Sequence, residues 1–517
     1  MSDESKLVAD AANPEIGKRN PEVEAEPESS ADKGKEKEME KFNPEQEKAR
    51  LKLAEMLYQN NEALQKEMGS LSPKELTERL KSMKIEDLMT GLATNQKNKK
   101  DMASYKFWST QPVARFDEPD KVDTDGEIQK EHGPVPENPS PLLNGFEWVT
   151  LDLTDGQQMH EVYELLTGHY VEDSEAMFRF NYSASFLEWA VKSPGWLKNW
   201  HVGVRVVGSK KLVAFISGIP TTLKIRNHTV KTSEINFLCI HKKLRSKRLA
   251  PVLIKEITRR CNQDGVWSAI YTAGVLLPKP VSTCRYFHRS LDWLKLYEVG
   301  FSPLPIKSTK QRQISKYALP SKTATAGLRE MEEKDIPEVG DLLRRYLDKF
   351  DLAPVYDDAE VSHWLLHKET GKGERVIWTY VVEDPKTHKI TDFFSFYLLE
   401  SAVIGNNKHK SIRAAYLFYY ASETAFEEGP DARKHLKVRL NSLMNDALIL
   451  AKSYKFDVFN ALTLLDNTLF LEEQKFGPGD GQLHYYLFNW RTGAIAGGIT
   501  SSNDIDESGS GVAVVML

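Results

Sequence analysis

The amino-acid sequence predicts an α/β protein built from two copies of one structural unit. In each copy a helix precedes a meander of strands, and a second helix and a further strand follow. Matching segments recur at a nearly constant offset, since Glu161-Val162 corresponds to Glu338-Val339 and Lys211-Leu212 corresponds to Lys389-Ile390. Self-similarity at a fixed spacing favours duplication over chance likeness of amphipathic segments. We therefore expect two halves, each a mixed sheet with flanking helices, related by a pseudo-twofold axis.

The elements of each half follow from the spacing of apolar residues. Apolar positions at helical spacing predict helices, and alternating or continuous apolar runs predict strands. The predicted elements of the first half are helices 155–170 and 250–261 and strands 201–207, 212–219, 234–240 and 267–273. The second half repeats this order with strands 412–420 and 456–461 and a helix near 438–452.

Four segments are expected along the chain. Residues 1–43 are rich in Glu, Lys, Pro and Ser, so they bury too little apolar surface to become ordered and are predicted to be a disordered charged tail. Residues 44–103 are predicted to be a helical extension, in which Ser72-Pro73 supplies an N-cap and a proline suited to a first turn. Residues 104–320 and 321–517 are expected to be the two halves of the α/β core.

Composition excludes several classes of function. The net charge of −5 argues against a protein that reads nucleic acid directly, so any phosphate site must be a local basic cluster. The three cysteines, Cys239, Cys261 and Cys284, form no CxxC pair, which indicates a reduced cytoplasmic protein without a structural zinc or other metal site. No apolar run approaches the length of a transmembrane helix, so we expect no membrane span.

The most informative motif lies at 234–251. An apolar strand runs to Ile240, five of the seven residues from Lys242 to Arg248 are basic, and a helix begins near Ala250-Pro251. A helix N-terminus presents unpaired N–H groups and the positive end of the helix dipole, and basic side chains beside it add to this field. A charge run is more often a solvated face, but its place between a strand and a helix favours a site for a polyanion such as a pyrophosphate.

Long motifs follow one another in a fixed order over residues 104–517. They are Tyr105-Lys-Phe-Trp-Ser-Thr-Gln-Pro-Val113, the segment 234–251, Tyr271-Thr-Ala-Gly-Val-Leu-Leu-Pro-Lys-Pro280, Cys284-Arg-Tyr-Phe-His-Arg-Ser290, Lys475-Phe-Gly-Pro-Gly-Asp-Gly481 and Gly511-Val-Ala-Val-Val-Met-Leu517. Together they resemble the N-myristoyltransferase family, and in particular its fungal members. Within the basic turn, Arg248 stands where acetyltransferase-like coenzyme A loops commonly have glycine.

The resemblance implies two duplicated acetyltransferase-like (GNAT-like) halves. It also implies a glycylpeptide N-tetradecanoyltransferase, an acyltransferase that moves myristate from myristoyl-CoA to the α-amine of an N-terminal glycine. The implied mechanism is direct attack, with the α-carboxylate of Leu517 as general base and the backbone N–H groups of Phe237 and Leu238 as oxyanion hole. Thr272 is implied to hold the amine, with Asn236 as a neighbouring polar group.

The resemblance further implies two binding regions and no tightly bound cofactor, with myristoyl-CoA as co-substrate. Residues implied to hold myristoyl-CoA are Tyr105, Lys106, Phe107, Trp108, Phe237, Leu238, Cys239, Ile240, Arg245, Ser246, Lys247, Arg248, Leu249 and Ala250. Residues implied to bind the peptide are Tyr170, Val171, Asp173, Phe178, Phe180, Tyr182, Phe287, His288, Ser395 and Asp480. The expected partners are N-terminal glycine peptides of nascent or cleaved proteins and, through the N-terminal region, the ribosome.

Two other functions stay open at this stage. Cys284 and His288 lie four residues apart, which on a helix would place them on one face and would allow transfer through a Cys-His acyl-enzyme. A non-catalytic scaffold for acyl-CoA or peptide would carry the same binding motifs. In addition, the polar stretch 497–511 separates Trp490 from the apolar chain end, and a displaced chain end would misplace Leu517.

Overall fold

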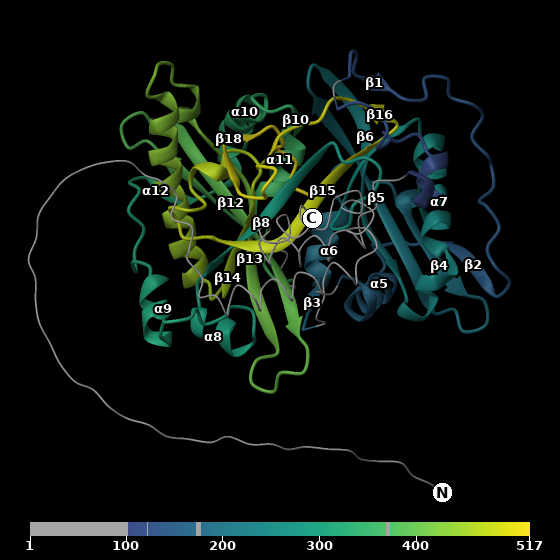
Figure 1. Ribbon diagram of the computed structural model, residues 1–517, viewed down its shortest axis with the longest axis horizontal. Helices are drawn as coiled ribbons and strands as arrows, with labels where there is room; N and C mark the ends of the chain where they lie inside the picture. The colour runs from purple at the N-terminus through teal and green to yellow at the C-terminus, as the bar shows by residue number, and fades with distance from the viewer. Residues whose placement is uncertain (1–101, 121, 172–176, 369–372) are drawn as a thin grey trace, which may run out of the picture. The chain divides into compact units, whose positions relative to one another are not determined.

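A computed structural model describes residues 102–120, 122–171, 177–368 and 373–517. Its main feature is a 14-stranded mixed sheet whose strand order is β2-β4-β5-β6-β7-β15-β8-β14-β13-β12-β11-β9, with β10 paired to β5 and β3 paired to β12. The order reads alike from both ends, because each strand of one half has a counterpart in the other. Figure 1 shows the helices packed against this sheet. The predicted fold class is therefore confirmed.

The first half of the sequence supplies one set of elements. These are β1 (Gly126–Glu127), β2 (Phe146–Thr150), α5 (Gly156–His169), β3 (Phe178–Asn181), α6 (Ala184–Val191), β4 (His201–Val206), β5 (Leu212–Ile225), β6 (His228–Ile240), α7 (Leu249–Gln263), β7 (Ser268–Ala273), β8 (Ser282–Ser290), α8 (Trp293–Glu298) and α9 (Lys310–Lys316). Short 3-10 turns η1 to η4 cover Met102–Ser104, Trp108–Thr110, Lys198–Trp200 and Lys242–Lys247.

The second half repeats the pattern. Its elements are β9 (Leu328–Glu330), α10 (Ile336–Leu347), β10 (Leu352–Pro354), α11 (Asp358–Leu365), β11 (Ile377–Glu383), β12 (Ile390–Val403), β13 (Ser411–Ser422), α12 (Ala432–Ser453), β14 (Val458–Leu462), β15 (Gly477–Phe488), β16 (Trp490–Arg491), β17 (Gly497–Ile499) and β18 (Ile505–Ser510). Its 3-10 turns η5 to η7 cover Glu333–Asp335, Glu423–Phe426 and Asn467–Leu469.

Local sequence explains where the helices begin. The Asp155 side chain accepts hydrogen bonds from the N–H groups of Gln157 and Gln158 and so caps α5. In α11 the cap is reciprocal, because Asp357 accepts from the N–H of Glu360 while the Glu360 side chain accepts from the N–H of Asp357. The helices and strands predicted from sequence are all present, although β5 and β6 extend well beyond the predicted limits.

The two halves exchange strands at the centre of the sheet. β8 follows β7 in the chain but pairs with β14, and β15 returns from the second half to pair with β7. β8 and β15 pair with each other between them. A smaller exchange repeats this on the outside, where β3 pairs with β12 and β10 pairs with β5. Backbone hydrogen bonds of each half are therefore completed by the other half.

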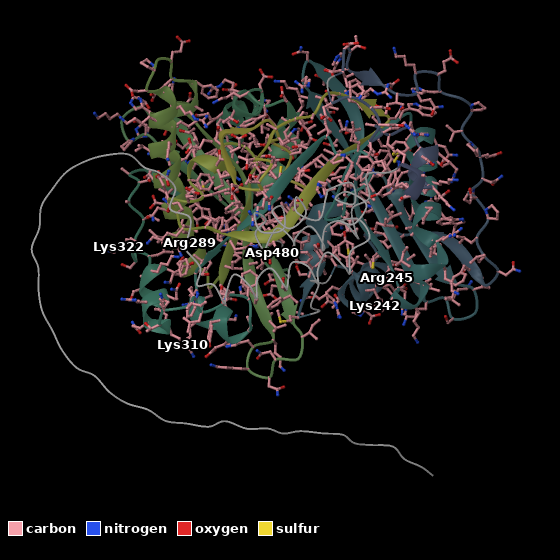
Figure 2. All side chains as sticks on the ribbon, viewed as in Figure 1. Lys242, Arg245, Arg289, Lys310, Lys322 and Asp480 are labelled. Atoms are coloured by element: carbon pink, nitrogen blue, oxygen red, sulfur yellow. The ribbon has the colours of Figure 1, made fainter. Side chains whose placement is uncertain are left out.

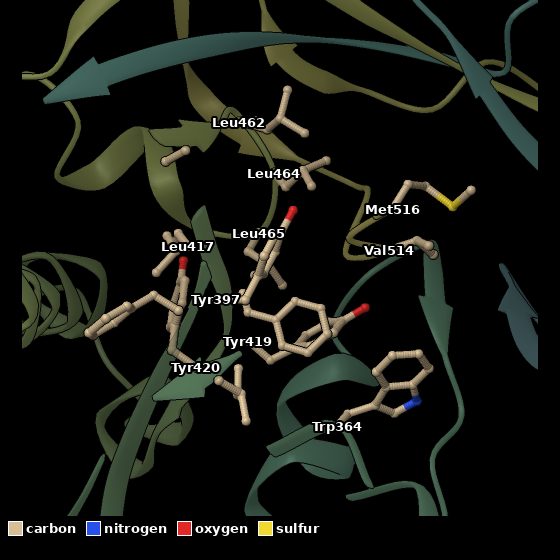
Figure 3. Close-up of a cluster of buried hydrophobic side chains, with 14 of the residues drawn as sticks. Trp364, Tyr397, Leu417, Tyr419, Tyr420, Leu462, Leu464, Leu465, Val514 and Met516 are labelled. Atoms are coloured by element: carbon tan, nitrogen blue, oxygen red, sulfur yellow. The ribbon is translucent and has the colours of Figure 1, made fainter. Parts of the chain in front are cut away.

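A continuous apolar core lies beneath this sheet. Figure 3 shows a part of it, in which Trp364, Tyr397 and Tyr419 lie near Val514 and Met516 of the chain end. Trp189 of the first half stacks edge-on against Trp364 of the second half, with ring centroids 5.1 Å apart. The core includes buried residues from both halves, so the predicted boundary at 320 divides the sequence without dividing the core.

The polar stretch 497–511 does not displace the chain end. It forms its own two-stranded sheet, β17 with β18. The chain then returns to the core, where the N–H of Ala513 donates to the Leu352 carbonyl at 2.7 Å and the N–H of Leu465 donates to the Val512 carbonyl at 2.9 Å. Val512, Ala513 and Val514 are buried.

Two sequence-based expectations need comment. Cys284 and His288 do not lie on a helix, because both belong to strand β8, so the helical spacing argument for a Cys-His pair was wrong. Four residues along a strand span about 13 Å, which is too far for proton exchange. The predicted tail 1–43 and nearly all of the predicted extension 44–103 lie outside the described residues. Within the described ranges, no helix combines the length and apolarity needed to cross a membrane.

The strand exchange predicts that neither half folds alone. We expect a fragment of residues 104–320 and a fragment of residues 321–517 each to lack a cooperative urea transition, because β7, β8, β14 and β15 would lose pairing partners. Refolded together, the fragments should regain a single transition by circular dichroism. A cooperative transition of either fragment alone would show that the predicted halves are independent domains.

Candidate active site

A cavity of about 210 Å³ opens where two parallel strands separate. β6 and β7 pair only as far as Glu234 opposite Ile270, and beyond that point they diverge beside α7. The gap is lined by apolar side chains from all three elements together with a few polar groups. The lining includes Trp108, Ile216, Ile235, Asn236, Phe237, Leu238, Ile254, Ile257, Tyr271, Thr272 and Leu517. The five residues predicted to be catalytic are thus brought to one cavity.

A bulge in β6 shapes the wall of this cavity. Phe215 of β5 lies opposite Cys239 and Ser217 lies opposite Asn236, so Phe237 and Leu238 share the single position opposite Ile216. Phe237 adopts a left-handed backbone with φ of 57°. Such a bulge turns backbone groups out of the regular ladder, and here it lies on the cavity wall.

Asn236 is held by a neighbouring carboxyl group. Its Nδ2 donates to Oε1 of Glu234 at 2.7 Å, so the carbonyl oxygen of the Asn236 amide is left for other donors. Burial raises the pKa of Glu234 from 4.5 to about 7, and the hydrogen bond from Asn236 opposes this shift. Glu234 is a residue of the site to which sequence reasoning assigned no role.

The end of the chain is held from several elements before it reaches the cavity. The N–H of Val515 donates to the Tyr419 hydroxyl at 3.1 Å, and the Tyr485 hydroxyl donates to the Val514 carbonyl at 2.9 Å. Met516 is buried, and Leu517 lines the cavity. The position of Leu517 therefore follows from contacts with the preceding residues.

The basic turn lies at one side of the same strand and helix. Lys242–Lys247 form the 3-10 turn η4, and Arg248 has a left-handed backbone with φ of 56° directly before α7. This conformation explains why related loops favour glycine at the position of Arg248. Figure 2 labels Lys242 and Arg245 here, and Arg245 donates to the His169 carbonyl.

The electrostatic environment of the turn is strongly positive. Burial, followed by the charges of His241, Lys242, Lys211 and Arg245, lowers the pKa of His169 to about 4. The His169 and His241 rings lie 3.9 Å apart. The same field that keeps these imidazoles neutral would attract a polyanion.

Stacked aromatic rings close the cavity on the side of the first predicted motif. Trp108 stacks on Tyr271 with centroids 5.5 Å apart, and Tyr271 stacks on Tyr486 at 5.1 Å. The Tyr105 hydroxyl donates to the Leu276 carbonyl at 3.0 Å, which fixes this segment over the cavity. The role of Tyr271 was not predicted, although it begins one of the quoted motifs.

A second cavity of about 230 Å³ collects several residues predicted to bind peptide. It is mainly apolar, and Val171, Phe178, Phe180 and His288 line it with Phe301, Ile412, Ala414, Tyr416, Val458 and Asn460. His288 Nδ1 lies 2.7 Å from the Asn460 amide oxygen. Gly479 lies against the ring, since a Cβ there would lie 2.4 Å from His288 Nε2. The exposed Asp480 follows and carries a charge that acts on His288.

Other predicted residues lie outside both cavities. Phe287 is buried in the core. Ser395 is also buried, and its hydroxyl donates to the Tyr419 carbonyl at 2.7 Å. Cys239 faces away from the first cavity, with Sγ 3.7 Å from the Leu165 carbonyl. Tyr170 lines the first cavity, and Tyr182 packs edge-on against Phe237.

Two predicted positions lie partly or wholly outside the description. Asp173 is not among the described residues, and neither is the side chain of Ser246. Cys284 is fully buried, and burial raises the pKa of its thiol to about 12. A thiol with such a pKa is protonated at neutral pH and is a poor nucleophile, which further weakens the Cys-His alternative.

Fold and site together define a class of protein. Parallel strands that separate over an apolar cavity, with a basic turn and a helix N-terminus beside them, form the arrangement by which acetyltransferase-like proteins hold an acyl-coenzyme A. The bulged strand supplies backbone groups next to the place where a thioester would lie. The chain is an acyltransferase of this fold.

Comparisons with known proteins give the family. Residues 127–284 and 298–515 match the N-terminal and C-terminal domains described as myristoyl-CoA:protein N-myristoyltransferase. A glycylpeptide N-tetradecanoyltransferase of Emericella nidulans is 61% identical over 466 residues, which cover 90% of this chain and 94% of the relative. The chain belongs to the N-myristoyltransferase family, and its resemblance to fungal members is confirmed.

Solved structures agree with this assignment. The crystal structure of Saccharomyces cerevisiae N-myristoyltransferase with bound myristoyl-CoA is 52% identical and has a TM-score of 0.77. The match covers 80% of this chain and 94% of that one. The glycylpeptide N-tetradecanoyltransferase of the same yeast is 50% identical over 459 residues, which cover 86% of this chain and the whole of the relative.

Glu234 makes stability depend on pH in a specific direction. Between its ordinary pKa of 4.5 and its folded pKa of about 7, the folded protein keeps a proton that the unfolded chain has released. The free energy of unfolding therefore falls as pH rises through this window. We expect Glu234→Gln to gain up to about 3 kcal/mol relative to the parent protein between about pH 5 and pH 8, measured by urea unfolding. The exposed Glu472→Gln is the control, and a pH-independent difference for Glu234→Gln would contradict the argument.

Proposed function

We propose that the chain transfers the myristoyl group of myristoyl-CoA to the α-amine of an N-terminal glycine by direct attack. A C–N bond forms at the acyl carbon, the C–S bond breaks, and coenzyme A leaves as its thiol. The observation that carries the proposal is the single cavity lined by Asn236, Phe237, Leu238, Thr272 and Leu517. The charge that develops on the thioester oxygen needs donors, and the backbone N–H groups at the bulge of β6 are proposed to supply them.

The base is the demanding part of this mechanism. An α-amino group has a pKa near 8 and a terminal carboxyl near 3.5, so moving a proton between them in water costs about 6 kcal/mol. In a dry cavity both charged forms lose hydration, and the gap narrows. The apolar lining around Leu517 supports this role. Thr272 is proposed to hold the amine, and the carbonyl oxygen of Asn236 to accept one of its hydrogens.

Myristoyl-CoA is proposed to lie between the aromatic lid and the basic turn. The phosphates would bind near Arg245, Lys247 and the start of α7, and the acyl chain would enter the apolar gap between β6 and α7. Each buried methylene contributes about 0.8 kcal/mol, so the chain alone supplies on the order of 10 kcal/mol. The peptide is proposed to approach from the second cavity, with Asp480 placed to pair with a basic residue of the substrate. The three cysteines are free and buried, which supports a cytoplasmic location.

Converting the Leu517 carboxylate to an amide tests the base. The amide keeps the length and packing of the chain end but removes the basic oxygen. We expect turnover of a glycine-starting octapeptide to fall by two orders of magnitude or more, with myristoyl-CoA affinity close to that of the parent protein. Leu517→Ala, which retains a free carboxylate, should lose far less. Parent-like turnover of the amide from about pH 6 to pH 9 would exclude Leu517 as the base.

Removing charge from the basic turn tests the cofactor site. Replacing Arg245 and Lys247 together with Ala should weaken myristoyl-CoA binding about tenfold or more, because charge-assisted contacts to phosphate are lost. Binding by the variant should also depend less on salt. Titration calorimetry at two salt concentrations measures both effects, and Lys434→Ala with Lys452→Ala on α12 is a control of equal charge. Equal affinity and equal salt dependence would place the phosphates elsewhere.

The same assay separates the scaffold alternative. Incubation with myristoyl-CoA and the octapeptide should add the acyl mass to the peptide alone. A scaffold would bind both ligands and leave the peptide mass unchanged, whereas an acyl-enzyme would also gain mass on the protein.

A further inference from the structure

A continuous segment between α8 and β9 carries positive charge and no negative charge. From Val299 to Arg329 the sequence contains no Asp or Glu. Five basic residues, Lys307, Lys310, Arg312, Lys316 and Lys322, are exposed along it. Among the described residues, no carboxylate forms a salt bridge with any of these five. We call residues 299–322 the basic ledge.

Carboxylates on the neighbouring elements do not neutralise the basic ledge. Glu298 at the end of α8 is paired with Lys408 and His409. Asp457 is paired with Lys295. The ammonium of Lys475 donates to the Lys316 carbonyl and adds a further charge. Nearby, Glu473 is paired with Lys437.

Aliphatic side chains project from the same segment. Ile306 is 92% exposed and Ile314 is 39% exposed. Single exposed apolar residues are common, but a nearly fully exposed Ile beside Lys307 is the combination that peripheral membrane proteins use, with apolar tips in the headgroup layer and lysines on the lipid phosphates. Aromatic rings that could stack nucleic-acid bases are instead covered, since Lys310 lies over Tyr297 and Arg289 lies over Tyr317.

We propose that the basic ledge binds the surface of a membrane that contains anionic lipids. Figure 2 labels Lys310 and Lys322 on one side of the described structure and Lys242 and Arg245 on the other, so this cluster is separate from the proposed coenzyme A site. Each basic side chain near an anionic leaflet strengthens binding by about fivefold, and five of them suffice for reversible docking.

The location gives the docking a purpose that rests on the proposed function. Phe301, near the start of the basic ledge, lines the second cavity and packs against His288 with ring centroids 5.4 Å apart. A peptide that leaves this cavity with a fourteen-carbon chain binds bilayers only weakly and reversibly by itself. Release beside an anionic surface would place the product where basic residues of its own can add to that binding.

Vesicle co-sedimentation of the full chain tests the proposal. We expect binding to phosphatidylcholine vesicles that contain about one third phosphatidylserine, and at least tenfold weaker binding to phosphatidylcholine alone. Raising salt from about 0.1 M to about 1 M should abolish binding, because the Debye length falls from about 10 Å to about 3 Å. Lys307→Glu with Lys310→Glu should weaken binding at least tenfold, and Ile306→Ser should weaken it severalfold.

Matched variants on α12 control for general effects. Lys434→Glu with Lys452→Glu changes the net charge equally, and Val438→Ser removes a side chain that is 65% exposed. These controls should bind vesicles like the parent protein. Octapeptide transfer in the absence of vesicles should be the same for all variants, because none of the changed residues lines either cavity.

The outcomes separate the two proposals. If transfer to the soluble peptide is absent in the parent protein, the proposed function fails. If transfer is present but vesicle binding is absent, or is reduced equally by the α12 controls, the membrane surface is wrong. Binding of polyuridylate that depends on Lys307 and Lys310, without binding to vesicles, would assign the basic ledge to RNA and would also overturn the inference.

Discussion

The pairing of β8 with β15 is the interaction on which the rest of the structure depends. Each of these strands lies in the sheet of the opposite half, so the pairing joins two halves that could otherwise separate. It also carries the chain back from the second half to the first. The Tyr485 hydroxyl on β15 then binds the Val514 carbonyl, which directs the last residues toward the first cavity.

The two halves contain the same opening, but only one remains available. In the second half, β13 and β14 stop pairing after Tyr416 and Asn460, as β6 and β7 do after Glu234 and Ile270. Phe418 and Tyr419 share the position opposite Ser395, which repeats the bulge of β6. There the Ser395 hydroxyl also accepts from the Tyr419 N–H, and Val515 and Met516 line a cavity of about 10 Å³. The second half has spent its opening on the chain end.

Much of the fold could be predicted because apolar spacing and helix caps are local signals. The helix after Asp155 and the strand before the basic turn are examples. The strand exchange could not be predicted, since nothing in the sequence of Ser282–Ser290 distinguishes pairing with β14 from pairing within its own half. Likewise, the spacing of Cys284 and His288 suits a helix or a strand, and only sheet pairing decides. The motifs located the cavity residues, whereas Glu234, Tyr271 and Phe301 act through neighbours distant in sequence.

A chain end is usually frayed, and a base that must lie within hydrogen-bond reach of an amine cannot fray. Here the last residues are restrained at alternate positions by different elements. Ala513 donates to Leu352 near β10, Val514 accepts from β15, and Val515 donates to Tyr419 on β13. Because Leu352 pairs with Ile225 of β5, even the outer strand exchange contributes to this restraint. A flexible terminus would need to be ordered at every turnover, while this one is ordered by folding, so the strand exchange that stabilises the protein also positions its proposed base.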